Sequence, residues 1–116
     1  MTYYHVMIEV RENLGKNDEI REINLFDVTD LQSIIPTILR PYLTHTTLHI
    51  DDEHVPYSNI KHFSVKQTAL PIQQLIEAEQ RELPSNTDIS ISAYEIFNDK
   101  ELAQDVTQVI IDLLDE

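Results

Sequence analysis

The stretch from His45 to His54 gathers many of the residues in this chain that could bind a metal or transfer a proton. It reads HTTLHIDDEH and holds three of the five histidines together with three consecutive acids. Imidazole nitrogens and carboxylate oxygens are ligands of zinc, which takes four of them in a tetrahedron. The weak candidates for such a metal site are His49, Asp51, His54 and, further along the chain, His62.

A second interpretation of the same stretch is a β-hairpin with a polar turn. Leu48 and Ile50 alternate with Thr47 and His49, which is typical of a strand with one face in water. The acids that follow are good turn residues. The sequence has no HExxH spacing, which would place two zinc-binding histidines on one helix face. We therefore favour the hairpin, and we predict neither a catalytic residue nor a bound cofactor.

Glycine and cysteine usage exclude several kinds of chemistry. The chain has one glycine, Gly15, and no cysteine. Phosphate-binding loops and dinucleotide fingerprints need several glycines, and a GxSxG nucleophile elbow needs two. Disulfides, thiolate metal sites and cysteine nucleophiles are excluded outright. The lack of cysteine is compatible with a reducing compartment, and we expect a cytoplasmic protein.

The charge balance restricts the partners that the chain can bind. There are 21 acids against 8 bases, which gives a formal net charge of −13. Nucleic acids and anionic membranes are bound through lysine and arginine, so we expect no direct binding to either. A basic protein partner fits better. The sequence also has no apolar run near the roughly 20 residues that span a bilayer.

The elements that would position these residues are strands mixed with helices. Alternating apolar residues predict strands over 3–10, 20–28, 47–50, 61–67 and 89–97, with a loop over 13–19. Apolar residues at helical spacing predict helices over 31–43, interrupted near Pro36, and over 70–83 and 98–116. We predict one domain, residues 1–116, of the α+β class. It has a mostly antiparallel sheet of about five strands with two or three packed helices.

The faces of these elements can also be assigned. In the strand at 61–67, Phe63 and Val65 should point inward and the residues between them outward. The last helix should bury an apolar face and expose its acids. That face comprises Leu102, Val106, Val109, Ile110, Leu113 and Leu114.

A series of short motifs runs along most of the chain: a first strand with a YHVxI-like pattern, an acidic pair, a helix that ends in Pro-Tyr, a hairpin, and a final Asp-Val-Thr. The residues of these motifs are Tyr4, His5, Val6, Ile8, Asp18, Glu19, Pro41, Tyr42, Ile50, Asp51, Asp52, Val55, Ile60, Thr68, Asp105, Val106 and Thr107. In this order they resemble a small N-terminal accessory domain of prokaryotic TIR-like or nucleotide-binding defence proteins. The resemblance implies no catalytic or binding residue for this part of such proteins.

The sequence therefore favours a non-catalytic protein-interaction or sensor domain, within a bacterial or phage defence system. A homodimer is a further expectation, because an exposed strand edge invites pairing. Two alternatives stay open. One is an acidic mimic of DNA that inhibits a nucleic-acid-binding protein, since residues 88–116 hold eight acids and one base. The other is a small hydrolase or metal protein that uses the histidines.

Overall fold

The main sheet is antiparallel and has four strands, as seen in the computed structural model, which describes residues 2–14, 17–84 and 91–114. Its strands are β1 (Tyr3–Leu14), β2 (Asn17–Val28), β5 (Ile60–Thr68) and β6 (Ala103–Asp105), in the order β2-β1-β5-β6. A separate two-stranded sheet pairs β3 (Thr47–Ile50) with β4 (Glu53–Pro56). With its helices, the chain has the predicted α+β fold.

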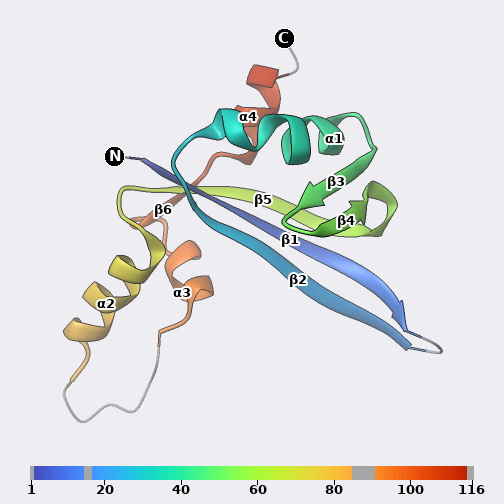
Figure 1. Ribbon diagram of the computed structural model, residues 1–116. Helices are drawn as coiled ribbons and strands as arrows, with labels where there is room; N and C mark the ends of the chain where they lie inside the picture. Colours follow the sequence, from blue (N-terminus) through green and yellow to red (C-terminus); the bar gives the residue numbers. More distant parts are fainter. Residues whose placement is uncertain (1, 15–16, 85–90, 115–116) are drawn as a thin grey trace.

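Helical segments cover both faces of the main sheet (Figure 1). On one face lie α1 (Arg40–Leu43), α4 (Thr107–Leu114) and the β3–β4 hairpin. On the other lie α2 (Ile72–Glu82) and α3 (Ala93–Phe97). Two short turns of 3-10 helix, η1 (Leu31–Ser33) and η3 (Tyr57–Asn59), and a π-helix, η2 (Ile35–Leu39), complete the elements.

The apolar residues separate into two clusters, one on each face of the sheet. Alternation along β1 sends Val6, Ile8 and Val10 into the main core, where each is at most 3% exposed. The helical segments at 31–43, the β3–β4 hairpin and α4 pack over them. The second cluster is smaller and joins α2 and α3 to the sheet. Its buried members are Ile72, Leu75, Ile96, Phe97 and Ala103.

The interrupted helix at 31–43 follows from its proline and its cap, as the sequence predicts. The Asp30 carboxylate accepts a hydrogen bond from the Gln32 amide and so caps the first turn. Pro36 lies in the first turn of η2, where its missing amide hydrogen costs little. The chain widens there into a π-helix, in which the Leu39 amide donates to the Ile34 carbonyl five residues earlier.

The structure corrects the predicted elements in three places. The strand predicted over 89–97 is wrong where it is described, because Ala93–Phe97 is the helix α3; residues 89 and 90 lie outside the described residues. The helix predicted over 98–116 holds the strand β6, and of its residues up to 114, where the description ends, only 107–114 are helical. The loop predicted over 13–19 is shorter, because β1 continues to residue 14 and β2 begins at residue 17.

Two predicted faces also differ from the structure. Val109 and Leu113 were expected in the buried face of the last helix, yet they are 58% and 64% exposed on α4. Ser64 was expected on a wet face, yet it is buried, because α3 lies against that side of the sheet. In the part of the chain that is described, no helix has the length and apolarity to cross a membrane.

Candidate functional site

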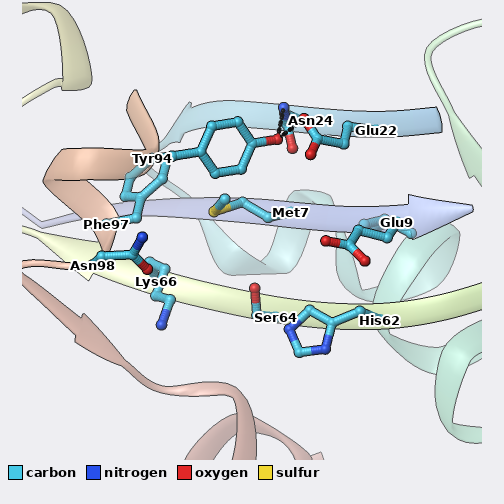
Figure 2. A pocket seen from close by; sticks show the side chains of 11 residues that line it. Met7, Glu9, Glu22, Asn24, His62, Ser64, Lys66, Tyr94, Phe97 and Asn98 are labelled. Atoms are coloured by element: carbon cyan, nitrogen blue, oxygen red, sulfur yellow. Dashed lines mark hydrogen bonds between the residues drawn. The ribbon is translucent and has the colours of Figure 1, made fainter. Parts of the chain in front are cut away.

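A polar groove lies on the face of the main sheet that α2 and α3 cover only partly. Its volume is about 270 Å³, and its floor is formed by β2, β1 and β5 with α3 at one end (Figure 2). Most of the lining side chains can donate or accept hydrogen bonds. The lining residues are Met7, Ile8, Glu9, Glu22, Asn24, His62, Ser64, Lys66, Tyr94, Phe97 and Asn98.

Strand register explains how residues far apart in the sequence reach this floor. Glu9 lies in the middle strand directly opposite Glu22 on one side and His62 on the other. Side chains opposite each other in an antiparallel sheet point to the same face. Two residues along, Met7 is opposite Asn24 on β2 and Ser64 on β5, which adds a second row. The groove is therefore floored by two rows of three side chains.

Tyr94 connects α3 to the β2 side of the groove. Its hydroxyl donates a hydrogen bond to Glu22 Oε2 and accepts one from Asn24 Nδ2 at 3.5 Å (Figure 2). Burial, and then the hydrogen bond to Glu22, raise the pKa of Tyr94. The phenol therefore stays protonated at neutral pH and acts as a donor that positions the Glu22 carboxylate.

The side-chain carbonyl of Asn24 is the unusual group of the groove. Asn24 Oδ1 is buried, yet among the described residues it has no hydrogen-bond partner. A buried acceptor without a donor typically costs about 1–3 kcal/mol. Asn24 Nδ2 and Glu22 Oε2 share the Tyr94 hydroxyl, so the two side chains lie together on the β2 side of the groove, while Oδ1 itself is closed to it.

Lys66, at the α3 end, is already engaged in an ion pair. Its Nζ lies 3.1 Å from Asp105 Oδ2 on the neighbouring β6. Burial opposes ionisation of Asp105, but hydrogen bonds from Thr107 and Lys66 outweigh it and lower the pKa of this carboxyl. The two glutamates at the other end, Glu9 and Glu22, therefore give the groove an excess of negative charge.

A buried histidine on β1 lies next to the groove, beneath Phe97. His5 is fully buried, and its ring centroid lies 5.0 Å from that of Phe97. It occupies a bulge, where this single residue of β1 faces Phe26 and Asp27 of β2. Burial lowers the pKa of His5, and the Asp27 carboxylate opposes this only in part. The imidazole is therefore neutral at physiological pH.

Hydrogen bonds fix the tautomer of this neutral ring. The Asp27 amide donates to His5 Nδ1 at 3.1 Å, so Nε2 carries the hydrogen and donates to Thr68 Oγ1 at 2.7 Å. The Thr68 hydroxyl in turn donates to the Leu70 carbonyl at 2.7 Å. Asp27 Oδ1 accepts from the Ile72 amide at 2.9 Å and caps α2. The chain of bonds thus joins three strands, β1, β2 and β5, and the helix α2.

This arrangement brings a hydroxyl, an imidazole and a carboxylate together, but not with the polarity of a catalytic triad. In a triad the imidazole accepts the hydroxyl proton and donates its other N–H to the carboxylate. Here the Thr68 hydroxyl is the acceptor of the His5 N–H, and the other ring nitrogen accepts from the Asp27 amide. His5 and Thr68 are buried, whereas the Asp27 carboxylate is at the surface, where it holds α2 on the sheet.

The predicted metal candidates are distributed over two places. His49 and His54 face each other across the β3–β4 hairpin, with ring centroids 4.6 Å apart. Asp51 lies in the turn of that hairpin with a φ of 52°, a conformation that aspartate tolerates better than most residues. His62 is on β5, in the groove. Within the described ranges, no three His, Cys, Asp or Glu residues are grouped so that they could hold a metal.

Sequence reasoning missed the remaining residues of the groove, although one signal was present. Alternation already assigns Glu9, Glu22 and His62 to the polar faces of their strands. What it does not give is the pairing of those strands. Tyr94 was missed because its segment was predicted to be a strand. Comparison with protein-family models, with curated proteins and with solved structures finds no match to this chain.

Proposed function

We propose that this chain is a protein-interaction domain that binds a basic segment of a partner in the groove of the main sheet. The observation that supports this most directly is the pair of facing carboxylates, Glu9 and Glu22, in a groove whose lysine, Lys66, is held by Asp105. An arginine side chain matches this set, because its guanidinium has five N–H donors and a fixed positive charge.

The groove also suits the apolar part of such a side chain. Met7 forms the middle of the floor, and Phe97 and Tyr94 form the wall on the α3 side (Figure 2). An arginine stem can lie along apolar groups while its charged end reaches the acceptors. Tyr94 holds Glu22 in place before the partner arrives, which lowers the entropy that binding must overcome.

The setting that we propose is a prokaryotic defence system, on the strength of the resemblance described above. There the domain would connect a basic partner to other components of the system without catalysing a reaction. A second copy of the chain is another partner to consider, because β2 is an edge strand of the main sheet.

Binding can be tested with a fluorescein-labelled octapeptide of alternating arginine and serine, measured by fluorescence anisotropy. The same peptide with citrulline in place of arginine keeps the shape but not the charge. We expect binding of the arginine peptide that weakens as salt is raised, because exposed charges are screened. Replacing both carboxylates, as Glu9→Gln with Glu22→Gln, should weaken binding about tenfold or more, because hydrogen bonds to charged groups are strong.

The matched control removes the same charge elsewhere on the surface. Glu82 and Glu101 are exposed and do not line the groove, so Glu82→Gln with Glu101→Gln should change affinity by less than about twofold. If the control pair weakens binding as much as the groove pair, the attraction comes from overall charge and the proposal is wrong. Equal binding of the citrulline peptide would contradict it as well.

A further inference from the structure

The outer edge of β2 is long, and along residues 21–24 it borders the turn of the β3–β4 hairpin, where Arg21 Nη1 lies 2.8 Å from Glu53 Oε1. The strand has 12 residues, and among the described strands it pairs with β1 alone. An edge of this length presents backbone N–H and C=O groups that another strand can bind, and proteins that stay monomeric usually shorten or cover such edges.

β2 also exposes two large apolar side chains on one face. Ile20 is 50% exposed and Phe26 is 37% exposed. They are six residues apart, and an even spacing puts both on the same side of a strand. Scattered single apolar residues on a surface need no explanation, but this pair lies along the longer of the two edge strands of the main sheet, since β6 at the other edge has three residues.

We propose that two copies of this chain associate through antiparallel pairing of their β2 strands, with the twofold axis at Ile23. In this register Ile20 of each copy lies directly opposite Phe26 of the other copy. The dimer therefore contains two Ile20–Phe26 contacts, which cover all four exposed apolar side chains. Glu22 lies opposite Asn24 of the second copy, whose amide can donate to the carboxylate. The main sheets then continue into one sheet of eight strands.

Neighbouring symmetric registers fit less well. With the axis at Glu22, the two copies would place this carboxylate against itself, and like charges directly opposite are destabilising. With the axis at Asn24, Glu22 would lie opposite Phe26 of the second copy, and the apolar ring would displace water that hydrates the Glu22 carboxylate. Only the axis at Ile23 pairs the two exposed apolar side chains with each other.

Association by this edge is opposed by charge, which gives it a distinctive salt dependence. Each copy carries a formal charge of −13, so the two repel. Raising the salt concentration screens this repulsion and should strengthen the dimer. Raising the salt concentration should, in contrast, weaken binding of a basic peptide in the groove. Because the two salt dependences are opposite, the dimer and the proposed function are tested independently.

Sedimentation velocity over a range of concentrations, at low and high salt, tests the dimer. Ile20→Glu should raise its dissociation constant at least about tenfold, because it replaces two buried apolar contacts by charges. Val109→Glu makes the same change at an exposed apolar position of α4 and should leave the constant unchanged. A chain that stays monomeric at millimolar concentration, or a dimer sensitive to Val109→Glu but not to Ile20→Glu, would overturn the proposal.

The absence of cysteine from the chain allows the register to be measured directly. A mixture of Glu22→Cys and Asn24→Cys chains should form disulfide-linked heterodimers under mild oxidation, because these positions are opposite each other and within disulfide reach. Each variant alone should cross-link much more slowly. Fastest linking of Glu22→Cys alone, or of Asn24→Cys alone, would show a different axis and refute the register proposed here.

Discussion

Replacement of Thr68 by valine tests the hydrogen-bond chain through His5. The substitution keeps the shape of a β-branched residue but removes the hydroxyl that accepts the His5 Nε2–H and donates to the Leu70 carbonyl. Because His5 is 0% exposed, water cannot replace the lost acceptor, and a buried donor without a partner costs about 1–3 kcal/mol. Leu70 is 43% exposed, so we assign little cost to its carbonyl. The expected loss in free energy of unfolding is about 2 kcal/mol.

Urea unfolding followed by circular dichroism gives this free energy by linear extrapolation. The matched control is Thr44→Val, which also removes a hydroxyl bonded to a backbone carbonyl, that of Arg40, but at an exposed position. It should cost less than about 0.5 kcal/mol. If Thr68→Val cost no more than the control, His5 would not depend on this hydroxyl, and the assigned tautomer would be wrong.

Three other predictions concern stability. Because burial lowers the pKa of His5, the unfolded chain binds a proton at this residue more readily than the folded chain does. The free energy of unfolding should therefore be highest above pH 6.5 and fall as the pH drops below it. Urea unfolding at pH 7.5 and 5.5 should show a smaller fall for His5→Gln. Asp27 has a φ of 61° and caps α2, so Asp27→Ala should lose about 1–2 kcal/mol while Asp27→Asn, which keeps both abilities, loses less than half as much by the same assay. Leu48 is fully buried in the main core, and Leu48→Ala should cost about 2–5 kcal/mol, visible as a lower thermal midpoint, whereas Leu113→Ala at an exposed position should leave the midpoint nearly unchanged.

The strands with a regular alternation were predictable, and the elements fixed by distant contacts were not. Alternation located β1, β2, β3 and β5 because each sends every second residue, mostly apolar, into the main core. The strand predicted over 89–97 rested on the alternation of Ile89, Ile91 and Ala93, yet Ala93–Phe97 is helical, with Ile96 and Phe97 packed together in the second cluster. β6 has three residues and pairs with Lys66–Thr68, a partner that no local pattern indicates.

The groove shows the same division between local and distant information. The sequence assigns polar side chains to one face of three strands, but only the register places Glu9 between Glu22 and His62. The Asn24 carbonyl is distinctive because of what surrounds it in the fold, and neither residue type nor spacing could indicate that it lacks a partner. The candidate metal residues were grouped from the sequence but are separated in the fold. His49 and His62 were candidates for one metal site, yet they belong to different sheets.

The division of apolar residues into two clusters has a consequence for how the molecule opens. The layer formed by α2 and α3 is held by five buried residues and the His5 bonds, whereas the main core has thirteen buried residues on the opposite face. Segments with fewer buried contacts open more often, independently of global unfolding. Amide hydrogens of α2 and α3 should therefore exchange with deuterium before those at the centres of β1 and β5. Each such opening would expose the face of the sheet that α2 and α3 cover. This layer therefore controls how much of that face solvent can reach.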